Sequence, residues 1–103
     1  MTMHSTLDGD VLTIALDGQI DADVAYQPYE EMAARTGEDG NGIATVILDV
    51  GAVTFADSTA LGTMVRMKEH AQDVGVRLEL RNTPPRLRRL LDMTALSDEF
   101  TFT

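Results

Sequence analysis

The stretch Ile43-Ala44-Thr45-Val46-Ile47-Leu48-Asp49-Val50 is the most apolar run of this 103-residue chain and decides how the rest is interpreted. β-Branched and other apolar residues follow one another along it without a regular alternation of polar ones. Such a run predicts a strand that is covered on both faces or central in a sheet. The polar, glycine-rich segment 38–42 precedes it as a loop, and a second loop is expected from Gly51 to Ala56.

One half-buried strand is predicted before this run and one after it. Segment 11–17 places Leu12, Ile14 and Leu16 on one face, and segment 76–81 alternates apolar with charged residues. Alternation with a period of two is typical of a strand that has one face on the core. The tail from residue 96 to 102 predicts a short helix and an edge strand.

Three helices are predicted between and after these strands. The first is expected from about Gln27 to Thr36, because Pro28 is tolerated only in a first turn, with Asp21 and Asp23 as candidate caps ahead of it. The third opens at the Pro84-Pro85 pair and runs to Asp92. The second spans about 59 to 74, and its buried face repeats at spacings of four and three through Ala60, Met64, Met67, Ala71 and Val74.

Strand and helix thus alternate, which predicts an α/β layer fold with crossover connections in a single domain over residues 1–103. Sites in such folds often lie at the carboxyl ends of strands. The triplet Asp57-Ser58-Thr59 lies there, after the central strand and at a helix start. One interpretation of the triplet is a plain helix cap, since all three side chains can accept from free backbone N–H groups.

The charge of the chain argues against some partners. The net charge is −9, and residues 1–57 hold 11 of the 17 acids but a single base, Arg35. This distribution predicts no binding to nucleic acid and no direct binding to an anionic membrane. A protein partner with a basic face is compatible with it, and simple solubility is the alternative.

Several kinds of site have no support in the sequence. The chain has no cysteine, and the lone histidines His4 and His70 have no second ligand at metal spacing, so no metal is predicted. Lys68 is the only lysine and follows no glycine-rich phosphate loop, so no cofactor is predicted. The segment 56–60 lacks the nucleophile elbow of serine hydrolases, which makes a hydrolase using Ser58 a distant alternative. With no signal-peptide pattern or membrane-spanning run, a cytoplasmic protein is expected.

Three segments resemble the STAS family, the sulfate-transporter and anti-sigma-factor-antagonist domain. Segment 48–62 resembles the family's core motif, in which a buried strand and an aromatic residue lead into Asp-Ser-Ser/Thr-Gly-Leu-Gly. Segment 18–21, Gly-Gln-Ile-Asp, is similar to the block before the first helix, and segment 82–96 to the last proline-basic-apolar block. The resemblance runs from about residue 11 to 102. It implies a single mixed sheet of four to five strands with about four helices mainly on one face.

The resemblance also implies a function for a stand-alone bacterial member. Such a protein binds, when unphosphorylated, an anti-sigma factor that is also a serine kinase, and so frees a sigma factor. Phosphorylation ends the complex and a serine phosphatase resets it, so the protein itself is no enzyme. Ser58 is then the acceptor, Asp57 its preceding acid and Thr59 a secondary candidate. The partner-binding residues implied are Asp21, Asp23, Asp57, Ser58, Thr59, Ala60, Leu61 and Gly62.

Two departures and one alternative accompany this resemblance. Ala60 stands where the family usually has glycine, and its methyl is expected to hinder a kinase-bound phosphate. Segment 26–29 does not follow the family pattern. The alternative is a scaffolding STAS subunit of a stress-signalling assembly or a lipid-transport complex, without a phosphorylation cycle. A monomer is expected when the protein is free, because no apolar helix face is left once the sheet is covered.

Overall fold

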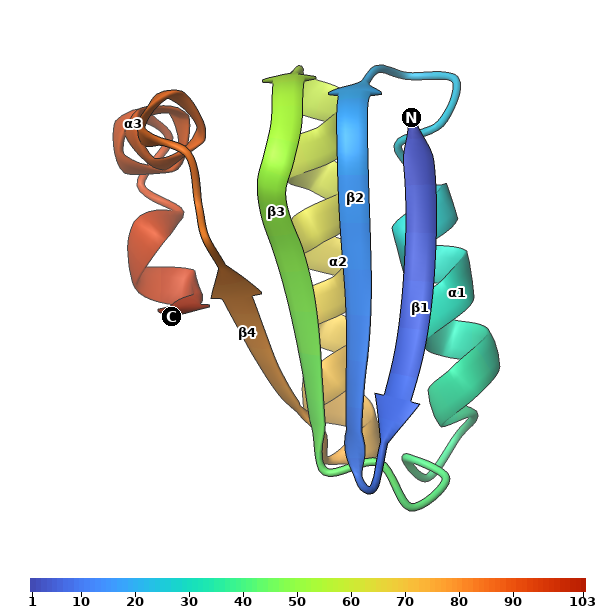
Figure 1. Ribbon diagram of the computed structural model, residues 1–103. Coiled ribbons are helices and arrows are strands. Elements are labelled where there is room, and N and C mark those ends of the chain that lie inside the picture. The colour runs from blue at the N-terminus through green and yellow to red at the C-terminus, as the bar shows by residue number, and fades with distance from the viewer.

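Five strands form one mixed sheet in the computed structural model, which describes residues 1–103 (Figure 1). They lie side by side in sequence order, with β1 antiparallel to β2 and every other neighbouring pair parallel. The predicted mixed sheet of four to five strands is confirmed. The strands are β1 (Thr2–Asp8), β2 (Val11–Ile20), β3 (Thr45–Ala56), β4 (Arg77–Arg81) and β5 (Thr101–Phe102).

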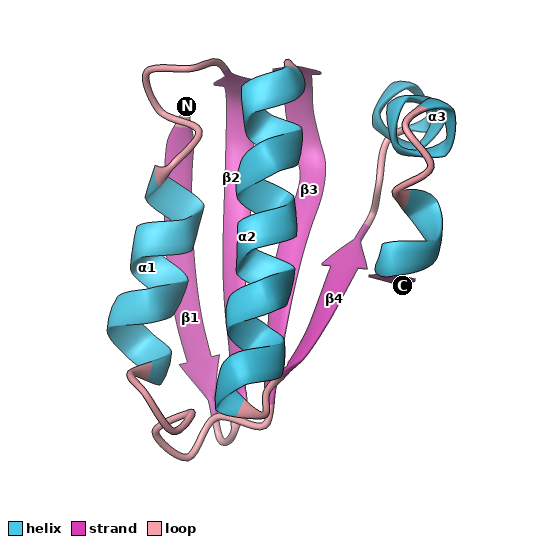
Figure 2. Ribbon diagram, turned by 180° about the vertical axis from the view of Figure 1, so that it is seen from behind, coloured by secondary structure: helices cyan, strands magenta, loops and turns pink.

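The helices cover one face of this sheet and one of its ends. Helices α1 (Gln27–Thr36) and α2 (Ser58–Val74) pack side by side over the strands (Figure 2), while α3 (Pro85–Met93) stands beyond the end of β4. The opposite face carries no helix (Figure 1). About four helices were expected, and the chain has three α-helices and a short 3-10 helix, Ser97–Glu99. No helix combines the length and apolar character that crossing a bilayer requires.

Strand β1 is an element that the sequence pattern did not predict. It forms a hairpin with β2 through Gly9, whose φ of +62° only glycine adopts easily. The two loop residues, Gly9 and Asp10, form a glycine-aspartate pair that is a known hairpin signal and could have revealed it. The strand itself lies at the sheet edge and is mostly exposed, so it shows no strong alternation of apolar and polar residues.

Strand β3 is longer than expected, and the predicted loop from Gly51 to Ala56 is wrong. The strand continues to Ala56 because β2 also continues and pairs with it up to Ile20. Two register shifts, between Ala15 and Asp17 and between Gly18 and Gln19, interrupt this pairing. Such bulges break the period of two, so the second half of β3 does not look like a strand in the sequence.

Strand β4, in contrast, ends early, at the pair Asp49↔Arg81. Asp49 Oδ1 accepts a hydrogen bond from the N–H of Gly51 (3.0 Å) and lies 3.4 Å from Asn82 Nδ2. Asn82 has a φ of +58°, which turns the chain away toward Pro84 and α3. Residues 51–56 of β3 therefore have β2 on one side and no strand on the other.

The core lies between the sheet and the two helices. In-register rows cross the three central strands, such as Leu12–Val46–Leu78 and Ile14–Leu48–Leu80, and all six side chains are at most 9% exposed. Helix α2 contributes Met64 and Met67 from its predicted apolar face. Leu61 and Thr63 are also buried there, while Val74 is only half-buried.

Gly51 is expected to tolerate no side chain. A Cβ added there would lie 2.9 Å from Asn82 Cβ, a distance that real structures do not show. Gly51→Ala should therefore lower the free energy of unfolding by about 1–3 kcal/mol. Gly62→Ala is the matched control: it lies inside α2 with open space around it, and should raise that free energy by about 0.5–1 kcal/mol. Urea unfolding would measure both, and a shift of the same sign in the two variants would contradict this packing.

Candidate functional site

Asp57 links the central strand to the longest helix. It follows β3 directly, and its backbone is extended (φ −101°, ψ −174°). Its carboxylate Oδ1 accepts hydrogen bonds from the N–H groups of Thr59 (3.0 Å) and Ala60 (3.2 Å). The cap that the triplet predicts is thus present, and the aspartate alone forms it.

Ser58 is the first residue of α2, and its side chain is exposed. Because Asp57 makes the cap, the Ser58 hydroxyl is not needed for it. The hydroxyl lies at the positive end of a 17-residue helix, where an anion is favoured by the helix dipole. The site therefore joins an accessible nucleophile with a position that suits a phosphate group.

The other motif residues divide into two groups. Thr59 and Gly62 are exposed, and Gly62 follows Ser58 by one helical turn, on the same face. Ala60 (2% exposed) and Leu61 (5% exposed) are buried, so neither side chain is open to a partner. The burial of Ala60 contradicts the expectation that its methyl group hinders a partner's phosphate.

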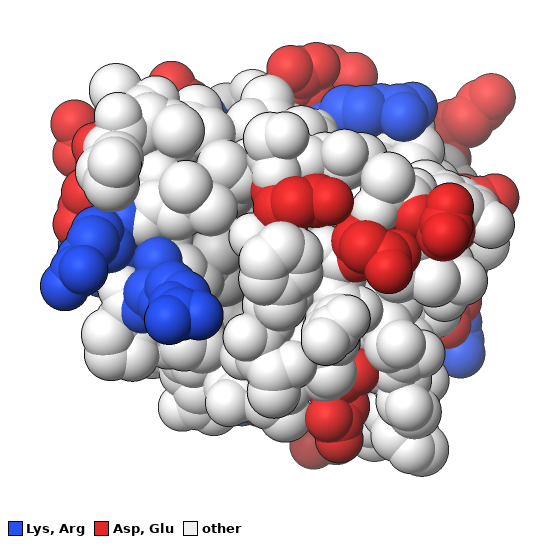
Figure 3. Space-filling model, turned by 90° about the horizontal axis from the view of Figure 1, so that it is seen from above, with Lys and Arg blue, Asp and Glu red and all other residues white.

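Asp21 and Asp23 lie at the same end of the sheet, since Ile20 of β2 pairs with Ala56 of β3. Both are exposed, but neither caps α1, contrary to expectation. Asp21 Oδ1 instead accepts from the N–H of Asp23 (3.1 Å), and a run of turns separates them from the helix, whose N-cap is Tyr26. Figure 3 views this end of the molecule, with acidic side chains across the middle and right and basic side chains on the left and at the upper right.

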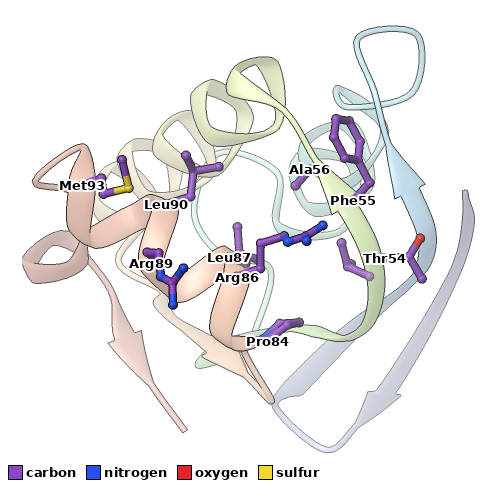
Figure 4. Close-up of a pocket in the computed structure, with 10 residues that line it drawn as sticks. Thr54, Phe55, Ala56, Pro84, Arg86, Leu87, Arg89, Leu90 and Met93 are labelled. Carbon is purple, nitrogen blue, oxygen red and sulfur yellow. The ribbon is translucent and has the colours of Figure 1, made fainter.

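A groove that the sequence did not predict lies beside the motif (Figure 4). It has a volume of about 320 Å³ and separates the end of β3 from α3. The three arginines of α3 are exposed, and two of them, Arg86 and Arg89, line this groove. No pattern in the sequence could have revealed the groove, because it exists only where β4 leaves β3. The residues that line it are Val53, Thr54, Phe55, Ala56, Pro84, Arg86, Leu87, Arg89, Leu90 and Met93.

The histidines lie away from Ser58. His70 Nε2 is 2.8 Å from Thr36 Oγ1, and its ring meets that of Tyr29 edge-on. It is twelve residues along α2 from Ser58, or roughly 18 Å at the rise of an α-helix. His4 is on β1, opposite Ala15. A hydrolase using Ser58 would thus have no histidine beside its nucleophile.

Comparisons with known proteins agree with this architecture. The model of the STAS domain family matches residues 3–103. A STAS-domain containing protein of Pseudomonas aeruginosa is 26% identical over 100 residues, which cover 97% of this chain and 95% of that protein.

Solved structures share the fold at lower identity. The anti-sigma factor antagonist SpoIIAA in its unphosphorylated form aligns with a TM-score of 0.77 and 16% identity, over 99% of this chain and 87% of SpoIIAA. SpoIIAA, a cell fate determinant of Bacillus, also matches in its phosphorylated form. A putative anti-sigma factor antagonist of Thermotoga maritima aligns with a TM-score of 0.82 and 16% identity, over 97% and 84% of the two chains. Because the family model matches nearly its whole length, this chain belongs to the STAS domain family.

Proposed function

We propose that this protein is a bacterial anti-sigma factor antagonist that works by partner switching in the cytoplasm. Unphosphorylated, it binds an anti-sigma factor that is also a serine kinase, and so frees a sigma factor. The kinase phosphorylates Ser58, the complex dissociates, and a serine phosphatase restores the hydroxyl. The observation that carries this proposal is the exposed Ser58 hydroxyl at the start of α2, left free because Asp57 alone caps the helix.

In this reaction the chain supplies only the hydroxyl group, so it acts as a substrate and not as an enzyme. The Ser58 oxygen attacks the γ-phosphorus of the kinase's ATP, the bond to the ADP oxygen breaks, and the hydroxyl proton passes to a base of the kinase. Asp57 holds the serine at the helix start by its two backbone hydrogen bonds. Thr59, also exposed, is the secondary acceptor.

The product should change the surface of the protein and leave its fold intact. A phosphate adds about −1.5 to −2 charges. At a helix N-terminus, negative charge stabilises the helix by about 0.3–1 kcal/mol. The loss of the complex then comes from repulsion and poor fit at the surface formed by the exposed motif residues, with Asp21 and Asp23 at the same end of the sheet.

Phosphate transfer to two alanine variants tests this function. Wild type, Ser58→Ala and Thr59→Ala are each incubated with the candidate kinase and radiolabelled ATP. We expect Ser58→Ala to lose more than about nine-tenths of the label and Thr59→Ala to keep most of it. Undiminished labelling of Ser58→Ala would exclude Ser58 as the acceptor. A scaffolding STAS subunit would instead bind its partner without being labelled.

A further inference from the structure

The second half of β3 has a free backbone edge. On one side its residues pair with β2, through Ala52, Val53, Phe55 and Ala56. On the other side the ladder with β4 ends at Asp49, and no backbone hydrogen bond outside the helices and ladders involves residues 51–56. Only Gly51 has a substitute partner there, the carboxylate of Asp49. An unpaired strand edge is a template on which another chain can add a strand.

The space beside this edge is an apolar groove rather than a closed contact. Helix α3 stands opposite, so the groove of about 320 Å³ runs between residues 53–56 and the helix. Four large apolar side chains of this chain are exposed, and two of them lie on opposite sides of the groove: Phe55 (48% exposed) on β3 and Met93 (76% exposed) on α3. Exposed apolar side chains that gather around one groove mark a binding surface.

The charge around the groove is opposite to that of the chain as a whole. Arg86 and Arg89 line it, and neither belongs to any of the four ion pairs, which join other residues. Figure 4 shows the Arg86 side chain reaching from α3 toward Phe55 and Ala56. Arg88 differs, because it lies over the Phe102 ring (3.8 Å) and pairs with Asp92. Two unpaired guanidinium groups beside an apolar groove favour a ligand that carries carboxylates.

We propose that this groove binds an extended, acidic segment of a partner protein, which adds a strand to the free edge of β3. Four residues of β3 border the groove, or roughly 13 Å at the rise of a strand, so the segment would be about four to six residues long. Its apolar side chains would enter the groove and its alternate carboxylates would meet Arg86 and Arg89. A helix would leave the edge of β3 unpaired, because its own backbone groups are already bonded. This docking does not depend on phosphorylation of Ser58.

Three peptides test the proposal against ¹⁵N-labelled protein by NMR titration. The first is a capped hexapeptide of alternating valine and glutamate, the second has lysine in place of glutamate, and the third is the first with alternate backbone nitrogens methylated. We expect the glutamate peptide to shift the amide signals of residues 51–56 and of α3. The lysine and N-methylated peptides should bind at least tenfold more weakly, because they lack the carboxylates and the backbone donors respectively.

Matched arginine variants test whether the arginines that line the groove bind the carboxylates, or whether any positive charge on α3 does so. The double variant Arg86→Gln, Arg89→Gln should bind the glutamate peptide at least tenfold more weakly, whereas Arg88→Gln should bind it as wild type does. Equal binding of the glutamate and lysine peptides would overturn the charge assignment. Undiminished binding of the N-methylated peptide would overturn strand addition, and an absence of shifts at these residues would overturn the site. None of these outcomes depends on whether Ser58 accepts phosphate.

Discussion

Replacing Leu48 by alanine is expected to lower the free energy of unfolding by about 2–5 kcal/mol. Leu48 is 1% exposed and lies in the middle of the sheet, opposite Ile14 of β2 and Leu80 of β4, which are both fully buried. Neighbours held in three paired strands cannot collapse fully into the space that is lost, so an apolar cavity remains. Domains of this size have a total stability of only about 5–15 kcal/mol, so the loss is a large part of it.

Two control variants separate the cavity from other effects of the substitution. Leu48→Met keeps the volume and should cost less than about 1.5 kcal/mol. Leu7→Ala removes the same atoms from a side chain that is 52% exposed, and should change the stability by no more than about 0.5 kcal/mol. Urea unfolding followed by circular dichroism measures all three. If Leu48→Ala lost no more stability than Leu7→Ala, Leu48 could not be at the centre of the core.

Ser58→Asp is expected to weaken the complex with the anti-sigma factor kinase by about 10- to 100-fold. The new carboxylate would stand on the exposed face of α2 with Thr59 and Gly62, where the proposed partner surface fits a bare hydroxyl. Unpaired or like charges at an interface cost several kcal/mol, and each 1.4 kcal/mol is about tenfold in affinity. The thermal stability of the free protein should not fall, since the charge lies at a helix N-terminus.

Ser58→Asn is the matched control, because asparagine has the shape of aspartate without its charge. Isothermal titration with the kinase would compare wild type with both variants. We expect Ser58→Asn to retain most of the affinity. Equal retention of the partner by wild type and Ser58→Asp would show that charge at Ser58 does not control binding, whereas an equal loss in both variants would assign the effect to shape.

Periodicity in the sequence predicts most of this fold. The alternation of Leu12, Ile14 and Leu16 and the spacing of Met64 and Met67 both place their side chains correctly in the core. Such patterns report which face of an element is buried, so they work where one face is regular and covered. They fail for β1, which is mostly exposed, and for residues 51–56, where register shifts interrupt the alternation.

The candidate site was predictable in part for a related reason. Asp57 and Ser58 lie where a helix begins, which local cap signals can locate, although the end of the preceding strand was predicted too early. The groove has no such signal, because it depends on how far β4 follows β3 before Asn82 turns the chain away. No local sequence pattern around Arg86 or Phe55 indicates that these two residues lie close together in the fold. Only the tertiary structure brings the two sides of the groove, β3 and α3, together.

The order of the strands also has a consequence for how the chain folds. Every strand pairs with the one before it in the sequence, so no later strand inserts between two earlier ones. During synthesis on the ribosome, each strand would find its pairing edge already present, starting from the β1–β2 hairpin. The parallel strand pairs can form only after the chain between them, which includes a helix, has closed into a loop. We therefore expect the domain to fold at the intermediate rates of mixed α/β domains. Because each new strand adds to the edge formed by the strand before it, the incomplete sheet has no gap between strands that a later strand must fill.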